Sequence, residues 1–261
     1  MNIRKDSGPL KWILIGISVL FLFVMLILPL SYVMYTAFSK GIKVFLAAVT
    51  DKYALHSIKL TIEVSLIAVV CNTFFGIFAS WLITKFQFKG KKIISTLIDL
   101  PLTVSPIIAG LIYVLTFGRQ SFIYPYLKAM GVRIIFAVPG IVLATIFVTF
   151  PFISRELIPV LTSQGTDEEE AAALMGANGW TIFWKVTFPH IKWPLLYGIV
   201  LCTARAMGEF GAVSVLSGHL RGRTNTMPLY IELLYQGYDF TGAFAAVSYT
   251  HLRAHETSQD L

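Results

Sequence analysis

Long apolar runs, separated by short polar segments, dominate this chain. The runs lie at about residues 12–38, 58–84, 97–117, 134–153 and 195–216. Each is close to the twenty or so residues that a helix needs to cross the hydrocarbon core of a membrane. The pattern therefore predicts an all-α, polytopic membrane protein in which these runs are the spans.

The composition agrees with a membrane domain. Of the 261 residues, 56% are hydrophobic and 13% are charged, and the mean hydropathy is +0.73. A formal net charge of +7 would suggest nucleic acid in a soluble protein. Here the Lys and Arg residues lie mostly in short loops, so membrane topology explains them better. We expect one membrane domain surrounded by lipid, with no nucleic-acid partner.

Basic residues in the loops predict the orientation. Lys85, Lys89, Lys91 and Lys92 occupy one short loop, and positive charge in short loops marks the cytoplasmic side. Residues 1–11 are also basic, and the apolar run after them is too long for a signal peptide and lacks a clear cleavage site. We expect a multi-pass protein of the plasma membrane with its N-terminus in the cytoplasm.

One long polar segment, residues 166–189, lies between the fourth and fifth runs. Thr166 and Glu169 have the spacing of a capping box, and the acids at 167–170 suit the first turn of a helix. Gly176 is placed to end that helix in the left-handed conformation. The segment predicts a short helix in a loop, and an ordinary surface helix is the alternative interpretation.

The third apolar run contains helix-breaking residues. Pro101 and Pro106 interrupt it, and Thr103 and Ser105 supply hydroxyl groups between them. Proline frees backbone carbonyls that need other partners, and broken helices in transporters often lie at the transport path. These four residues are therefore candidates for a translocation path, and a kink that serves packing is the alternative.

The fifth run contains two charged residues. Arg205 and Glu209 are four positions apart, so they share a helix face and are expected to pair. Charges inside a membrane are costly and are usually functional or paired. Gly208 and Gly211 are expected to allow close helix packing. Two interpretations remain open, since the pair either fixes helix packing or lines and gates a translocation path.

A donor-rich segment follows the fifth run. It contains Ser217, His219, Arg221 and Thr224, whose side chains suit contact with an oxyanion or with a binding protein on the outer side. An exposed loop of ordinary polar composition is the alternative.

The sequence favours neither an enzyme nor an ATP-binding chain. No cluster of His, Asp, Cys or Ser residues has catalytic spacing at the membrane face, and the glycine-rich phosphate loop of ATPases is missing. No metal site is expected. His251 and His255 have a metal-ligand spacing, but they fall in a tail to which we assign no function.

The C-terminal residues 247–261 do not continue the pattern. A sixth span begins near Ala243 and gives way to polar sequence. The string VSYTHLRAHET at 247–257 resembles the translation of a transposase-end adapter used to prepare sequencing libraries. We therefore expect a non-native tail and a truncated last helix. Genomic DNA that encodes the tail without interruption would contradict this expectation.

The polar segment carries a resemblance to a known family. Glu170-Ala171-Ala172, then Gly176, then the Val-Thr-Phe-Pro ending at Pro189 resemble the EAA loop of ABC-importer permeases. Residues 204–219 and 221–229 resemble the sulfate/thiosulfate permease pair of that family, most closely its W-type member. The resemblance covers about residues 10–246.

This resemblance implies a fold, partners and a function. The fold would be the type I ABC-importer permease fold, with a six-helix core, in a bacterial plasma membrane. The chain would form the translocation path of an ATP-driven importer of sulfate or thiosulfate, together with a T-type permease and an extracytoplasmic sulfate-binding protein. Separate ATPase subunits would hold ATP and Mg, so this chain binds no cofactor. The residues implied to couple to the ATPase are Glu170, Ala171, Ala172, Gly176 and Pro189.

Two other functions remain as alternatives. A molybdate or tungstate permease of the same family would carry a tetrahedral dianion like sulfate, but such permeases usually pair with themselves. An ion-coupled secondary anion transporter would also use broken helices and intramembrane charges, but it would need no loop that docks on an ATPase.

Overall fold

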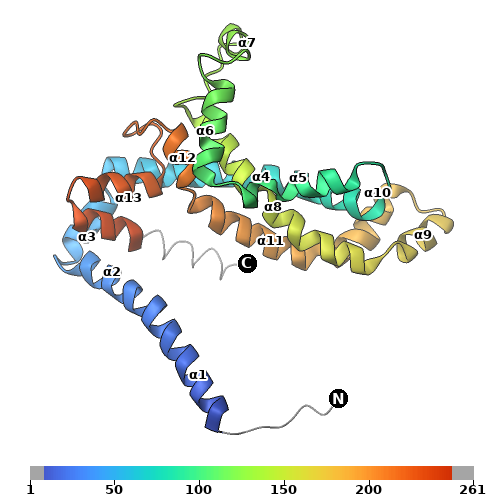
Figure 1. Ribbon diagram of the computed structural model, residues 1–261, viewed down its shortest axis with the longest axis horizontal. Helices are drawn as coiled ribbons and strands as arrows, with labels where there is room; N and C mark the ends of the chain where they lie inside the picture. Colours follow the sequence, from blue (N-terminus) through green and yellow to red (C-terminus); the bar gives the residue numbers. More distant parts are fainter. Residues whose placement is uncertain (1–8, 249–261) are drawn as a thin grey trace. The chain divides into compact units, whose positions relative to one another are not determined.

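The computed structural model describes residues 9–248, and all regular structure in that range is helical (Figure 1). The predicted all-α class is confirmed. The described residues form two units, one made of residues 9–51 and 231–248 and the other of residues 52–230. Most of the expected non-native tail, including His251 and His255, lies outside the described residues.

The first unit contains the N-terminal span. Helix α1 (Pro9–Leu22), the π-helical turn η1 (Phe23–Ile27) and α2 (Leu28–Phe38) follow one another without a break. Over Lys11–Phe38 they are long and apolar enough to cross a membrane. Gly41, with a φ of 90°, turns the chain into α3 (Ile42–Val49). Residues 240–248, where the sixth span was expected to begin, are helical.

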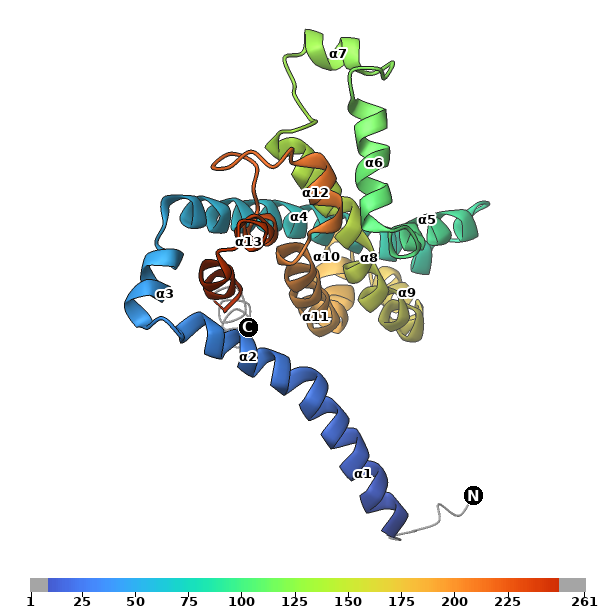
Figure 2. The ribbon, with the colours of Figure 1, turned by 60° about the vertical axis from the view of Figure 1, so that its left-hand side comes forward.

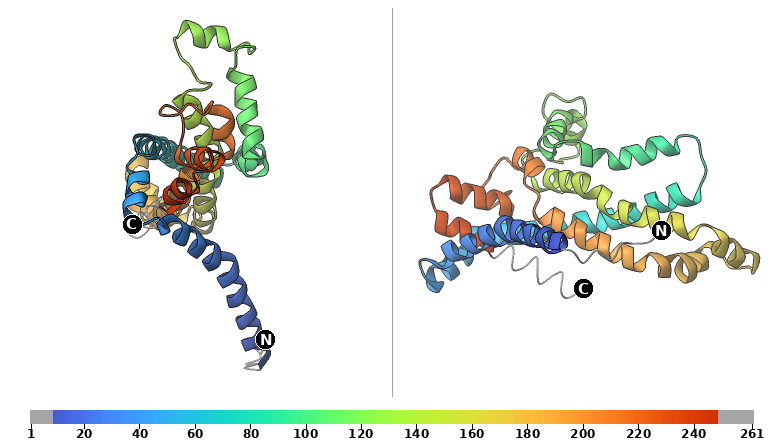
Figure 3. Two further views of the ribbon diagram at one scale, coloured as in Figure 1. Left: turned by 90° about the vertical axis from the view of Figure 1, so that its left-hand side faces the viewer. Right: turned by 60° about the horizontal axis from the view of Figure 1, so that its bottom comes forward.

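The second unit is built around three helices. Helices α4 (Lys52–Lys85), α8 (Val138–Gln164) and α11 (Phe188–Met207) lie side by side (Figure 3). The remaining elements are α5 (Lys91–Thr103), α6 (Pro106–Phe117), α7 (Tyr124–Ala129), α9 (Asp167–Leu174), α10 (Gly179–Ile182), the π-helical turn η2 (Phe183–Thr187), α12 (Gly211–Leu216) and the start of α13 (Met227–Gln236).

Apolar side chains and one polar bridge hold the three central helices together. The buried cluster consists of Val69, Ile153, Leu157, Leu161, Ile191, Leu195 and Cys202. The helices approach closely at Gly76, where an added Cβ would lie 2.8 Å from Cγ2 of Ile153. Asn72 of α4 donates a hydrogen bond of 2.7 Å to the Thr149 hydroxyl of α8. Small residues and single polar bridges of this kind are typical of helix packing in membranes.

The third apolar run is a broken helix. Helices α5 and α6 are bent by 109° relative to each other, and Figure 2 shows α6 rising away from α5. The break falls at Val104 and Ser105, directly before Pro106. A residue that precedes proline is held in an extended conformation, and proline has no N–H to continue a helix. Both effects stop α5 here and allow α6 to start in a new direction.

The fifth run differs from the predicted span. Helix α11 starts earlier, at Phe188, and ends at Met207, and the separate helix α12 begins at Gly211. The interruption contains Glu209, whose Oε1 accepts a hydrogen bond of 2.8 Å from the backbone N–H of Ala212. This carboxylate thus satisfies a donor in the first turn of α12, which stabilises a second helix start inside the run.

Candidate functional site

The polar segment between α8 and α11 begins with α9. All four acids occupy its first turn, but the predicted capping box is wrong, because the Thr166 side chain makes no capping hydrogen bond. The backbone carbonyl of Thr166 accepts the first helical hydrogen bond, from the N–H of Glu170 at 2.9 Å. The Glu169 carboxylate is engaged elsewhere, with Lys85 and Thr187.

The end of α9 is fixed by glycine, as predicted. Gly176 has a φ of 84°, a left-handed conformation that glycine adopts without steric cost. Its N–H donates to Ala173 O at 2.9 Å, and the N–H of Ala177 donates to Ala172 O at 3.0 Å. These two bonds form a Schellman motif, so the turn after α9 has a defined shape.

This turn presents an apolar tip to the outside. Leu174 is 89% exposed and Met175 is 83% exposed, although both lie in the most polar segment of the chain. Glu170 and Ala171 are exposed beside them, whereas Ala172 is buried. A defined turn with two exposed apolar side chains suits insertion into a groove of another protein.

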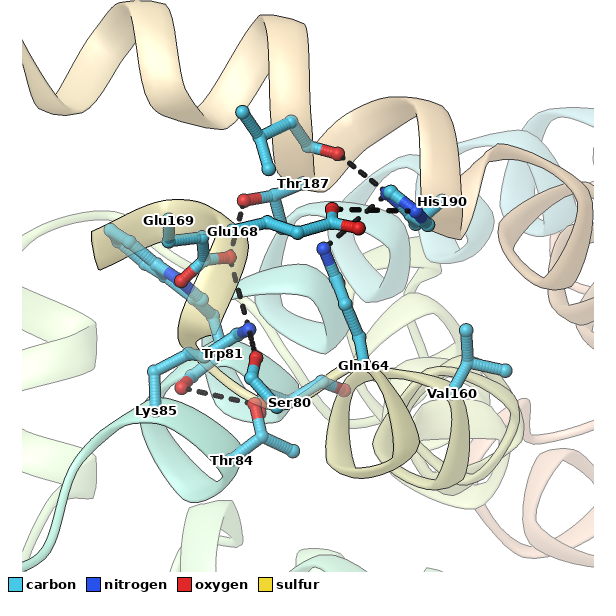
Figure 4. A network of polar contacts seen from close by, with 12 residues as sticks. Ser80, Trp81, Thr84, Lys85, Val160, Gln164, Glu168, Glu169, Thr187 and His190 are labelled. Carbon is cyan, nitrogen blue, oxygen red and sulfur yellow. Dashed lines mark hydrogen bonds and ion pairs between the residues drawn. The ribbon is translucent and has the colours of Figure 1, made fainter. Parts of the chain in front are cut away.

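A polar network joins the inner face of the segment to the helical core (Figure 4). The Lys85 Nζ lies 3.0 Å from Oε1 of Glu169 and also donates to the carbonyl of Gly165. The Thr187 hydroxyl donates to the same Glu169 oxygen at 2.6 Å. The network therefore connects the end of α4, the helix α9 and the turn η2.

A second contact lies beside this network. His190 Nε2 is 3.6 Å from Oε2 of Glu168, and His190 Nδ1 is 2.9 Å from the carbonyl oxygen of Val186. Pro189, next to His190, stands in the first turn of α11, where proline is tolerated because an N–H there has no intrahelical partner. These contacts of His190 fix the end of the polar segment where the chain enters α11.

The charged pair of the fifth run forms as predicted. Arg205 Nη1 lies 2.6 Å from Oε2 of Glu209. The Glu209 side chain is 1% exposed and that of Arg205 is 33% exposed. The pair connects the last turn of α11 to the interruption before α12, so it braces the break as well as neutralising the buried carboxylate.

The structure brings the two broken runs together. Pro106, the first residue of α6, contacts Gly211, the first residue of α12, where an added Cβ would lie 2.9 Å from Pro106 Cβ. Gly211 thus permits close packing as predicted, but Gly208 has only Ala204 O within 4 Å, at 3.6 Å. Of the other path candidates in the third run, Pro101 is buried, and Thr103 and Ser105 are exposed near the bend between α5 and α6.

The contact between α6 and α12 gives a stability prediction. An added Cβ on Gly110 would lie 2.8 Å from Ala212 O and 3.1 Å from Val215 Cβ. We expect Gly110→Leu to lower the stability of the solubilised protein by about 1–3 kcal/mol, because overpacking forces the helices apart. Thermal unfolding in detergent measures this. Gly16→Leu is the control, since nothing lies within 4 Å of an added Cβ at Gly16, and an equal loss in both variants would contradict the prediction.

The donor-rich segment after α12 is partly occupied with its own hydrogen bonds. Ser217 and Thr224 are buried, and the Thr224 hydroxyl donates to the Ser217 carbonyl at 2.6 Å. Arg221 lies over the ring of Tyr53, 5.0 Å from its centroid. His219 is exposed and has a φ of 53°. The loop therefore presents His219 and Arg221, but not Ser217 and Thr224, at its surface.

The chain matches a known family over residues 72–250, the binding-protein-dependent transport system inner membrane components. The match covers more than half of the chain. The chain belongs to this family. It is therefore a multi-pass membrane permease and not an enzyme, and its class implies a partner ATPase and a partner binding protein.

Individual relatives agree with the family. The chain is 49% identical over 254 residues to the sulfate transport system permease protein CysW of Escherichia coli (strain K12), covering 96% of this chain and 87% of the relative. It is 34% identical over 223 residues to a probable sulfate transport system permease protein cysT of Chlorokybus atmophyticus, covering 85% and 78%. The resemblance to W-type permeases of ABC importers is confirmed.

A solved structure supports the fold. The chain is similar to a chain of a bacterial alginate ABC transporter, crystallised in complex with an alginate pentasaccharide-bound periplasmic protein. The TM-score is 0.80 at 19% identity, covering 94% of this permease and 90% of the other chain. The type I importer permease fold is thereby shown.

Sequence reasoning missed three features of the site. The sequence predicts Lys85 only as a loop charge that marks topology, and it gives no sign of the contact made by Thr187. Leu174 and Met175 were not singled out, although two large apolar residues next to a helix-ending glycine in a polar segment were a usable signal. Nothing local to Lys85 indicates that a residue 84 positions later in the chain pairs with it.

Proposed function

We propose that this permease is the W-type subunit of an ATP-driven importer of sulfate. The observation that carries the proposal is the 49% identity, over nearly the whole chain, to a sulfate transport permease of W type. The identity to a T-type relative is lower, at 34%, which supports the W-type role. The substrate class would be tetrahedral dianionic oxyanions, with thiosulfate carried as well.

The proposed assembly contains three further kinds of subunit. A T-type permease completes the path, two ATPase subunits hold ATP and Mg, and an extracytoplasmic sulfate-binding protein delivers the anion. In this chain Glu170, Ala171, Ala172, Gly176 and Pro189 act in coupling. The exposed apolar tip formed by Leu174 and Met175 supports docking into a groove of the ATPase.

The contacts support a cytoplasmic position for the coupling segment and the N-terminus. Lys85 begins the lysine-rich loop and pairs with Glu169, so this loop and α9 share one end of the unit. Positive charge in a short loop favours the cytoplasmic side. Two candidate spans, Lys11–Phe38 and α4, separate the N-terminus from this loop along the chain. Two crossings would put the N-terminus on the same side as the loop, in the cytoplasm of a bacterium.

A basic cavity lies at the other end of the central helices. It has a volume of about 490 Å³ and is lined by residues of the α6–α8 connection, including Arg119, Lys128 and Arg133. Among its lining residues, all within the described part of the chain, there is no Asp or Glu. Three positive charges without a lining acid favour an anionic substrate at the outer mouth.

The proposed mechanism couples two sites. Closure of the ATPase dimer on ATP moves α9, and the helices attached to it rock between inward-open and outward-open arrangements. The broken segments at Pro106 and at Glu209 lie together on the path between the two faces. The Arg205 side chain, one-third exposed, would meet the anion there.

Uptake in cells tests this function. The chain is expressed with a T-type permease, the ATPase and a sulfate-binding protein in bacteria that lack their own sulfate permeases. We expect uptake of labelled sulfate that requires all four proteins and that is lost with an ATPase unable to hydrolyse ATP. Excess thiosulfate should compete with uptake, whereas excess molybdate should not. Uptake of molybdate in place of sulfate would move the assignment to molybdate permeases, and uptake without the ATPase would indicate a secondary transporter.

A further inference from the structure

We propose that Lys85 is a positioning residue that ties the coupling helix α9 to α4. Through this tie, movement of α9 reaches α4, a helix that the chain does not join directly to the coupling segment. This inference rests on the proposed coupling to an ATPase. It assigns a role to a residue outside the EAA segment, and it makes Glu169, rather than Glu170, the acid that holds the segment to the membrane helices.

The geometry of Lys85 is that of a buried anchor. It is the last residue of α4, and its side chain is 5% exposed. Its Nζ meets two oxygens of the coupling segment, Oε1 of Glu169 at 3.0 Å and the carbonyl of Gly165. Figure 4 shows the Lys85 ammonium group directed at the Glu169 carboxylate. A lysine withdrawn from water in this way requires partners, because an unpaired buried charge is strongly destabilising.

Two other lysines of the loop differ from Lys85 in their exposure to solvent. Lys89 and Lys92 are exposed, so their charges remain in solvent and serve topology. The Glu169 carboxylate is also largely buried, with a side chain that is 15% exposed, and it receives the Thr187 hydroxyl on the same oxygen that pairs with Lys85. Lys85 and Glu169 therefore form a specific, largely buried ion pair and not a surface contact.

The position of the Lys85–Glu169 ion pair in the fold allows it to transmit a displacement of α9 to α4. The coupling segment is continuous in sequence with α8 and α11, so any displacement of α9 reaches those helices through the chain. Helix α4 has no such connection. Lys85, together with the ring contact between Trp81 and Phe183 at 6.3 Å, links α4 to the segment.

Helix α4 then extends to the far end of the unit. It is 34 residues long, and Asn72 near its middle is bonded to Thr149 of α8. Towards its N-terminal end the Thr61 hydroxyl accepts a hydrogen bond of 2.7 Å from the N–H of Met227, directly after the outer donor-rich segment. A continuous helix bonded at Lys85 and at Thr61 provides a contiguous physical connection between the coupling segment and the outer loop.

The test compares single and paired substitutions in the purified complex of four proteins. Lys85→Met leaves Glu169 unpaired, and we expect the binding protein's stimulation of ATP hydrolysis to fall at least about tenfold while the subunits still purify together. Lys85→Arg keeps the charge and should retain most of the stimulation. The exchange Lys85→Glu with Glu169→Lys should recover a substantial part of it. Lys92→Met, an exposed lysine of the same loop, is the matched control and should behave as wild type.

Stimulation within twofold of wild type in Lys85→Met would overturn the inference. If that variant fails to assemble, Lys85→Met with Glu169→Leu replaces the ion pair by an apolar pair, which buried sites often tolerate. If this double variant assembles but loses stimulation, the result supports the role of the Lys85–Glu169 ion pair. If it assembles and is stimulated normally, the inference is overturned. Stimulated ATP hydrolysis does not depend on which anion is carried. A wild-type complex that is stimulated by a loaded binding protein but takes up no sulfate would therefore refute the proposed substrate and leave this test intact.

Discussion

Glu209→Gln is expected to reduce sulfate uptake by at least about tenfold, because it removes one partner from a buried ion pair. The glutamine can still accept from the Ala212 N–H, as Glu209 does at 2.8 Å. It cannot neutralise Arg205, whose Nη1 lies 2.6 Å from the carboxylate. The variant therefore separates the charge of Glu209 from its role at the start of α12. Initial rates of labelled sulfate uptake, normalised to the amount of assembled complex, measure the effect.

A paired variant decides between the two interpretations of this ion pair. Arg205→Met with Glu209→Gln removes both charges, so packing without an unpaired charge is restored. If the pair only fixes packing, the double variant should regain thermal stability and uptake together. If the pair lines the path, stability should recover while uptake stays low, which is the result we expect. Glu63→Gln is the control, since Lys59 and Glu63 form an exposed pair with 3.7 Å between Nζ and Oε1, and exposed pairs contribute little.

Gly176→Val is expected to abolish most of the stimulated ATP hydrolysis and uptake. Gly176 has a φ of 84°, and a β-branched residue in the left-handed region costs about 1–2 kcal/mol or more. The Schellman turn would open, and the apolar tip at Leu174 and Met175 would lose its shape. Binding of sulfate to the isolated binding protein should be unchanged, because this turn belongs to another subunit.

The control for this variant separates the effect of the position of Gly176 from the effect of backbone strain alone. Gly41, between α2 and α3, also has a positive φ, of 90°, and an added Cβ there meets nothing within 4 Å. Gly41→Val therefore strains the backbone at a turn that belongs to no proposed site. Similar losses of stimulation in both variants would contradict a specific docking role for the turn. Glu170→Ala, which removes an exposed charge of α9 without straining its backbone, should lower stimulation to a smaller extent.

Features that depend on local sequence were predictable. Lipid leaves the backbone no partner outside the helix, so long apolar runs had to be helical. Gly176 follows from the local requirements of a helix end. Arg205 and Glu209 pair as their spacing predicted, although Glu209 lies beyond the end of α11 and not on the same helix. Pro106 marks the point where the third run breaks, because proline restricts both itself and the residue before it.

Features that depend on distant partners were not predictable. The capping box failed because Lys85 and Thr187 compete for the Glu169 carboxylate, and both come from other elements. The break between α11 and α12 was missed because the Glu209 side chain supports a new helix start, which no hydropathy pattern reveals. Burial of Ser217 and Thr224 likewise depends on a loop that closes on itself through the hydrogen bond between them.

The most direct test of the central claim uses proteoliposomes that contain this permease, a T-type permease and the ATPase. Labelled sulfate uptake and ATP hydrolysis are measured together, with and without the sulfate-loaded binding protein. The account predicts that the loaded binding protein stimulates hydrolysis, that sulfate accumulates only with ATP, and that Gly176→Val loses both effects. Sulfate accumulation that persists without ATP, or in full with Gly176→Val, would contradict it.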